Sequence, residues 1–193
     1  YIGRPIYSGA LADLVIIIVA GTPGTGKSTV ARALAKRYGM CYLNVSEFAI
    51  SRRLYTDYDE ESRSYVIDEE RLVEELNGYL SSRDCVVETI YPSLVRRADK
   101  VLVLRRHPKE LWEELTRRGW PLAKVAENVE AEVLGVVSQE ARESFGEVCE
   151  IDVTGKSVEE VVELFEKGVC KNVDWLSDPD VVEVLELIQR SLK

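Results

Sequence analysis

Residues 14–36 read LVIIIVAGTPGTGKSTVARALAK, and this stretch decides the fold. Its first seven residues, 14–20, form an apolar run rich in β-branched side chains, which favours a buried strand. A glycine-rich turn follows at 21–26, and residues 27–38 then have the spacing of an amphipathic helix. The stretch therefore predicts a strand, a tight loop and a helix in direct succession, as in a parallel α/β sheet.

The turn between strand and helix is a phosphate-binding motif, because residues 21–28 match the pattern G-x-x-x-x-G-K-[ST] at every fixed position. Backbone N–H groups of such a loop wrap a phosphate chain, and glycine at Gly24 and Gly26 lets the backbone approach closely. Lys27 is placed to reach the β- and γ-phosphates, and Ser28 to bind Mg²⁺. The predicted phosphate-binding residues are Gly24, Thr25, Gly26, Lys27, Ser28 and Thr29.

Short apolar runs continue to alternate with amphipathic stretches along the rest of the chain. Further strands are predicted at 40–43, 85–87, 100–104 and 148–153, and helices at 68–80, 108–118, 121–145, 158–169 and 178–192. Residues 1–12 and 55–65 lack a clear period. We therefore expect an α/β fold with a five-stranded parallel sheet flanked by helices, as a single domain over residues 1–193.

The amino-acid composition indicates which kinds of macromolecule the protein is expected to bind. The chain has 34 acidic and 25 basic residues and a net charge of -9, which opposes direct DNA binding and favours a basic protein partner. Its longest apolar run is too short to cross a membrane, so we expect a cytoplasmic protein. The four cysteines form no C-x-x-C pair, and we expect them to be buried, inert thiols.

Three further places carry candidate functional residues. Glu88 ends a predicted strand, at the edge where parallel sheets hold their ligands, so it could hold the Mg²⁺ shell; a structural acid is the alternative. Arg117 and Arg118 join two predicted helices and could close over phosphates, or could lie in a solvated helix end. The tetrapeptide TGKS at 154–157 is by itself best explained as a strand-to-helix turn.

Taken together, these residues resemble an adenylate kinase of the isoenzyme six type, a P-loop family linked to maturation of the small ribosomal subunit. The resemblance covers residues 15–175. Outside the loop it rests on the segments 43–47, 66–72, 103–105, 116–120, 127–133 and 154–157. It implies a P-loop nucleoside triphosphate hydrolase fold with a nucleoside-monophosphate-binding segment at about 44–67 and a lid at about 116–124. It also implies that Arg118 contacts ATP and that Lys156 lies near the adenine.

The activity implied by the resemblance is transfer of the γ-phosphoryl group of MgATP to AMP, with Lys27, Arg118 and Glu88 as catalytic residues. ATPase activity and a role in small ribosomal subunit biogenesis are implied as well. Two alternatives stay open. One is an ATP-gated assembly factor that binds a basic small-subunit ribosomal protein and has little kinase activity; the other is a kinase for another small acceptor.

The chain departs from the family pattern at two places. Ile90 stands where the family has a histidine, and the preceding acid, Glu88, is longer by one methylene. Because isoleucine cannot transfer a proton, hydrolysis or transfer is expected to be weaker, or the role to have moved to another group. Ile50 stands where some members have an arginine, and Arg52 or Arg53 could replace it.

Overall fold

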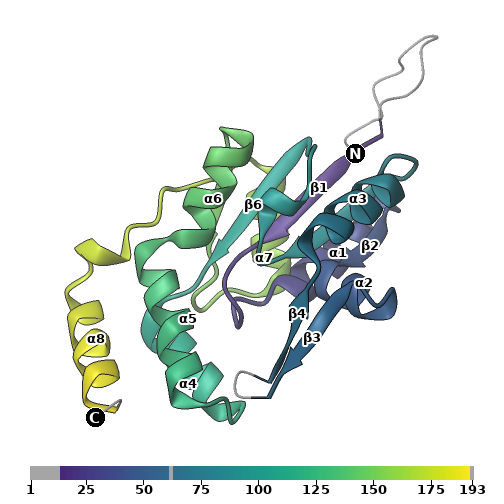
Figure 1. The fold of residues 1–193 in the computed structure, drawn as a ribbon. Coiled ribbons are helices and arrows are strands. Elements are labelled where there is room, and N and C mark those ends of the chain that lie inside the picture. The colour runs from purple at the N-terminus through teal and green to yellow at the C-terminus, as the bar shows by residue number, and fades with distance from the viewer. Residues whose placement is uncertain (1–13, 61–62, 192–193) are drawn as a thin grey trace.

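A five-stranded parallel sheet forms the centre of the protein (Figure 1). The computed structural model describes residues 14–60 and 63–191, so residues 1–12, for which no element is expected, lie outside the described part. The strand order is β2-β5-β1-β6-β7. The strands are β1 (Ile16–Ala20), β2 (Cys41–Asn44), β5 (Cys85–Thr89), β6 (Lys100–Arg105) and β7 (Cys149–Asp152). The predicted α/β fold class is confirmed.

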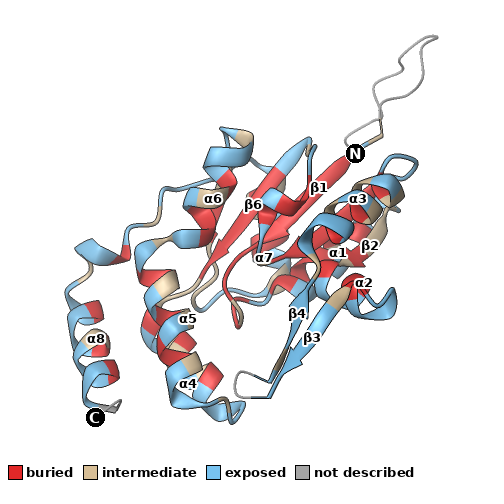
Figure 2. Cartoon of the chain, in the orientation of Figure 1, coloured by how far each residue is buried: buried red, intermediate tan, exposed pale blue. Residues whose placement is uncertain are grey.

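Helices cover both faces of this sheet, so the central strands β1 and β5 are buried along their whole length, while the edge strands β2 and β7 are only partly buried (Figure 2). Side chains of β1 alternate between the two faces. Ile17 packs with α1 (Lys27–Tyr38) and α7 (Val158–Glu166). Ile18 packs on the opposite side, in the core shared with α2 (Val45–Ser51), α3 (Glu69–Leu80) and α6 (Val136–Phe145). The result is a three-layer α/β/α arrangement.

A second group of helices packs beside the sheet. It consists of α4 (Pro108–Arg117), α5 (Leu122–Leu134) and the C-terminal α8 (Pro179–Ser191). Leu111 and Leu115 of α4 share an apolar cluster with Val129 of α5 and Ile188 of α8. In Figure 1, α8 lies on the outer side of α4 and α5, far from the N-terminal strand. The C-terminal helix is therefore anchored to the two helices that follow β6.

The single long helix predicted at 121–145 is wrong. The chain forms α5 and α6 instead, separated by Gly135, whose φ of 65° lies in the left-handed region. Glycine adopts that conformation without the steric cost of a Cβ atom, so it ends one helix and redirects the chain. The apolar periodicity runs through the break because α5 packs against α4 while α6 packs against the sheet.

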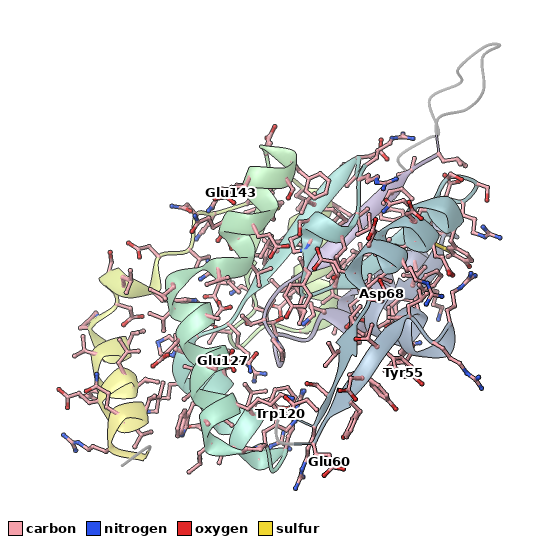
Figure 3. The ribbon with its side chains drawn as sticks, viewed as in Figure 1. Tyr55, Glu60, Asp68, Trp120, Glu127 and Glu143 are labelled. Atoms are coloured by element: carbon pink, nitrogen blue, oxygen red, sulfur yellow. A yellow bond between two sulfur atoms is a disulfide. The ribbon has the colours of Figure 1, made fainter. Side chains whose placement is uncertain are left out.

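Residues 44–67 contain elements that periodicity does not predict. After α2, the strands β3 (Tyr55–Asp59) and β4 (Ser64–Ile67) form an antiparallel hairpin. Most hairpin side chains are exposed, so no apolar alternation marks the strands in the sequence. The hairpin projects from the same edge of the sheet as α4 (Figure 1). In Figure 3, Glu60 on the hairpin and Trp120 after α4 both lie near the bottom of the view.

The expectation of free thiols is wrong for all four cysteines. Cys41 and Cys85, opposite each other on β2 and β5, form one disulfide, and Cys149 and Cys170 form the other. Their Cα atoms are 4.5 and 4.9 Å apart, within the range that a disulfide requires. Spacing in the sequence could not show this, because folding brings distant cysteines together: β2 and β5 pair Cys41 with Cys85, and the segment after α7 places Cys170 beside Cys149 of β7. Across residues 14–60 and 63–191, no helix has the length and apolarity needed to cross a membrane.

Candidate active site

Three glycines of the loop between β1 and α1 have a positive φ, and the first of them, Gly21, has a φ of 151°. Gly24 has a φ of 90° and Gly26 a φ of 85°. A Cβ atom on Gly24 would lie 2.7 Å from the Leu111 side chain, so glycine is also required there for space. Gly26 precedes the first turn of α1 and offers that turn no side-chain cap. Backbone N–H groups at this helix end therefore face the loop as an anion-binding surface.

Lys27 lies in the floor of the loop. The residue is 8% exposed, and Nζ donates a hydrogen bond to the Thr22 carbonyl at 2.9 Å. Burial lowers the pKa of Lys27 to about 8; the neighbouring Glu88 carboxylate opposes this shift and Arg118 adds to it. The ammonium group thus sits where the loop would surround a phosphate, and its charge depends on pH near 8.

Glu88 of β5 lies directly beside the loop. The Ser28 hydroxyl donates to Glu88 Oε1 at 2.7 Å, and the Tyr42 hydroxyl donates to Oε2. Burial, and then the hydrogen bond to Glu88, raise the pKa of Tyr42 above its ordinary value, so Tyr42 stays a donor. Sequence reasoning missed Tyr42. A signal for Tyr42 was present in the sequence. Tyr42 lies two positions before Asn44 on β2, the strand beside β5, so both polar side chains point to the same face of the sheet.

Oxygen ligands for a magnesium ion are present at this point. A hydroxyl and a carboxylate, from Ser28 and Glu88, meet at the N-terminus of α1. Mg²⁺ binds hard oxygen ligands and is commonly held by one or two protein groups, with water and substrate phosphates completing the shell. The two residues predicted from the sequence therefore fit that ion.

Arginines lie around the loop on the α4 side. Arg118, which caps α4, lines the same cavity as Lys27 and Glu88. Its Nε donates to Glu114 Oε1 at 2.8 Å, and Arg117 also pairs with Glu114. Sequence reasoning missed Arg106, whose Nη1 donates to the Gly24 carbonyl at 2.9 Å.

Three adjoining cavities run along the carboxyl edge of the sheet. The first, of about 600 Å³, is lined by Gly26, Arg106, Arg117 and Lys156 among others. The second, of about 420 Å³, contains the loop and shares Gly26 and Thr29 with the first. The third, of about 650 Å³, lies under the β3–β4 hairpin. It shares Ser46, Thr89 and Ile90 with the second, so the loop cavity connects the other two.

Comparison with known proteins shows which family this chain belongs to. The AAA domain family matches residues 17–135. A protein named "Putative adenylate kinase" from Sulfurisphaera tokodaii is 50% identical over 171 residues, which cover 89% of this chain and 91% of the relative. A protein of the same name from Thermococcus onnurineus is 41% identical, covering 90% of this chain and 98% of the relative. This chain belongs to their family.

Solved structures support the same fold for this family member. A shikimate kinase from Acinetobacter baumannii superposes with a TM-score of 0.53 at 18% identity, covering 82% of this chain and 96% of that one. A gluconokinase from Sinorhizobium meliloti 1021 gives a TM-score of 0.52 at 18% identity, covering 80% and 91%. The chain therefore has a P-loop kinase fold.

The third cavity shows how this family member departs from the pattern at Ile50. Ile50 lines the cavity together with Tyr65 and Tyr91. Arg52 and Arg53, the two residues expected to replace an arginine at position 50, do not line this cavity. Arg52 instead pairs with Glu75 and lies over the Phe48 ring. Arg63, after the hairpin tip, is the cation that lines this cavity among the described residues, and it has a φ of 51°. No periodic pattern in the sequence marks it.

Glu132 is the least expected residue near the loop. It lies on α5 and is 2% exposed, and its Oε2 accepts a hydrogen bond from the Thr22 hydroxyl at 2.7 Å. A signal for it exists in the sequence, because an acid at this position interrupts the buried apolar stripe between Val129 and Val133. A buried carboxylate requires partners of its own, which makes such an interruption informative.

Proposed function

We propose that this protein transfers the γ-phosphoryl group of MgATP to AMP and so forms two molecules of ADP. One observation carries the proposal: the loop cavity shares Gly26 and Thr29 with one neighbouring cavity, and Ser46, Thr89 and Ile90 with the other. A donor nucleotide held on one side and an acceptor on the other would meet at the loop. Phosphoryl transfer needs this in-line meeting more than it needs covalent chemistry from the protein.

On the donor side, each group has a separate task. The adenine would occupy the first cavity near Lys156, and the phosphates would lie on the loop. Lys27 and Arg118, which line the loop cavity, would balance the charge that spreads over the transferring group. Mg²⁺ held by Ser28, with Glu88 organising its shell, would supply further charge neutralisation. The segment at about 116–124 would act as a lid, because Arg118 lies in it and faces the loop cavity.

On the acceptor side, residues 44–67 would bind the monophosphate. Ile50, Ile67, Tyr65 and Tyr91 give the third cavity apolar and aromatic walls suited to a nucleobase. Arg63 would meet the acceptor phosphate in place of an arginine at position 50. Because Ser46, Thr89 and Ile90 line both this cavity and the loop cavity, the acceptor phosphate would lie next to the loop.

The deciding experiment is an ADP assay with purified protein, MgATP and a panel of nucleoside monophosphates and small hydroxylated acceptors. We expect ADP from ATP plus AMP at a rate that Lys27→Ala reduces by about 100-fold or more. Equal rates for wild type and Lys27→Ala would reject the proposal. A higher rate with a different acceptor would replace AMP by that acceptor.

A second candidate function is an ATP-gated assembly factor for the small ribosomal subunit. The net charge of -9 supports it, because an acidic surface steers a cationic partner. Ile90 supports it as well, because it replaces a proton-transferring histidine beside the loop. The expected result is a salt-sensitive complex with a basic small-subunit ribosomal protein that ATP dissociates. No complex at low salt would reject this function and leave the kinase proposal unaffected.

A further inference from the structure

Glu132 is a buried carboxylate that joins three parts of the chain. Its Oε2 accepts the hydrogen bond from Thr22 of the phosphate loop. Its Oε1 accepts from the indole Nε1 of Trp175 at 2.9 Å, from Arg105 Nε at 2.7 Å and from the Arg106 backbone N–H at 3.2 Å. One side chain on α5 therefore contacts the loop, the end of β6 and the segment that leads into α8.

The surroundings of Glu132 keep its charge balanced. Arg105, 2% exposed, pairs with Glu132 through Nε and with Glu150 through Nη1, at 2.7 and 2.9 Å. Arg142 pairs with the other oxygen of Glu150. Because the network holds two arginines and two glutamates, the carboxylate of Glu132 is paired rather than isolated. Its remaining oxygen is thus committed to the loop hydroxyl.

Thr22 connects this network to the phosphate-binding groups. Its hydroxyl donates to Glu132, while its carbonyl accepts the hydrogen bond from Lys27 Nζ at 2.9 Å. A phosphate on the loop competes for the Lys27 ammonium group and so acts on the Thr22 peptide. Trp175 lines neither the loop cavity nor the cavity beside Lys156. Any response of its indole to nucleotide must therefore travel through intervening groups.

We propose that Glu132 is a positioning residue that holds the phosphate loop through Thr22 and couples occupancy of the loop by nucleotide to Trp175 and the C-terminal helix. Thr22, Glu132 and Trp175 are all buried, so the chain of hydrogen bonds is shielded from competing water. The inference rests on nucleotide binding at the loop and not on the identity of the acceptor.

The test uses paired variants of Thr22 and the indole N–H signals of the three tryptophans in ¹⁵N-labelled protein. Thr22→Val removes the hydroxyl at nearly constant shape, and Thr22→Ser keeps it. The probe is the imido analogue of ATP with Mg²⁺. We expect the analogue to shift the Trp175 signal in wild type and in Thr22→Ser, and to shift it less in Thr22→Val, where Arg106 is the remaining link between Gly24 and Glu132. We also expect Thr22→Val to bind the analogue about tenfold more weakly than Thr22→Ser, the size of one hydrogen bond to a charged group.

Three outcomes overturn the proposal. If the Trp175 signal shifts as much in Thr22→Val as in wild type, the proposed coupling is rejected. If Thr22→Val and Thr22→Ser bind the analogue with equal affinity, the proposed positioning role is rejected. Wild type that binds no analogue, with all three indole signals unchanged, overturns the coupling together with the proposed function. The first two results leave the proposed function untouched.

Glu132→Gln gives an independent check, because it keeps the size of the side chain and removes the charge. We expect it to weaken binding of the analogue at least as much as Thr22→Val does. The double variant should bind no more weakly than Glu132→Gln alone, since both changes act on the same contact between Thr22 and residue 132. Additive losses in the double variant would mean that Thr22 and Glu132 act separately, which contradicts the proposal.

Discussion

The Ser28 hydroxyl donates a 2.7 Å hydrogen bond to Glu88 across 60 positions of sequence. It ties the first turn of α1 to the end of β5, two elements that pack against each other in the core. Glu88 is 6% exposed and its second oxygen is bound by Tyr42. The carboxylate is therefore held in one orientation beside the phosphate loop before any substrate arrives.

The Tyr42–Glu88 contact predicts a change in magnesium dependence. Tyr42→Phe should raise the Mg²⁺ concentration needed for half-maximal ADP formation by about tenfold, because Glu88 loses the donor that orients it. The measurement is a magnesium titration of the ATP plus AMP reaction. Tyr38→Phe is the matched control, since it removes a tyrosine–glutamate hydrogen bond to Glu166 on the exposed side of α1. Equal magnesium curves for both variants would contradict the prediction.

The pKa of about 8 for Lys27 predicts that nucleotide affinity falls in alkaline solution. Phosphate binds the protonated form better, so affinity is fully present below about pH 8 and falls above it, by up to about tenfold per pH unit. Calorimetric titrations with MgATP between pH 7 and about 9.5 measure this slope. Lys27→Arg keeps its charge over the whole range and should give a flat profile. The same slope in both proteins would show that another group titrates.

The two arginines at the C-terminal end of α4, Arg117 and Arg118, should differ in their effect on catalysis. Both pair with Glu114, but Arg118 lines the loop cavity while Arg117 lines the cavity beside Lys156. Arg118→Ala should lower kcat by about 100-fold or more, because charge on the transferring group loses a counter-ion. Arg117→Ala removes an equivalent partner of Glu114 and should lower kcat by less than about fivefold. Steady-state ADP formation measures both values, and equal losses would refute the assignment of Arg118.

Replacing Ile90 by histidine should increase the rate of ATP hydrolysis. Ile90 lines both the loop cavity and the acceptor cavity, so a proton-transferring side chain there would reach a water beside the loop. Ile90→His should raise ATP hydrolysis without acceptor by about tenfold or more. Phosphate release from MgATP is the measurement, with Ile90→Leu as a control for changed packing. No difference between the two variants would show that position 90 lies outside the reach of the attacking water.

The Cys149–Cys170 disulfide should contribute to stability. It closes a loop with a sequence separation of 21, so replacing both cysteines by serine should lower the free energy of unfolding by about 3 kcal/mol. Denaturant unfolding of the double variant and of wild type gives the difference. Thiol labelling of the unreduced, unfolded wild type should leave the cysteines unlabelled, and a label on Cys149 or Cys170 would contradict the pairing.

The sequence pattern was sufficient to predict those parts of the candidate site whose residues are close together in the chain. Lys27 and Ser28 follow the glycines of the loop in the chain, so strand, turn and helix could be predicted together, and α1 begins and ends where periodicity indicates. Glu88 could be placed because it lies near the carboxyl end of a buried strand, one residue before β5 ends at Thr89. The same reasoning failed at Gly135, because an apolar stripe cannot show that its two halves face different partners.

The sequence by itself determined the phosphate-loop motif and the acid near the end of β5, because each depends on residues within one turn or one strand of each other. It also determined the α/β class, because apolar runs and amphipathic stretches alternate along the chain. Only the tertiary structure decided which distant groups meet: Tyr42 with Glu88, Glu132 with Thr22, and Arg63 with Ile50 around one cavity. These meetings depend on strand order and helix direction. Both are set by the packing of the whole core, which no short segment of the chain encodes.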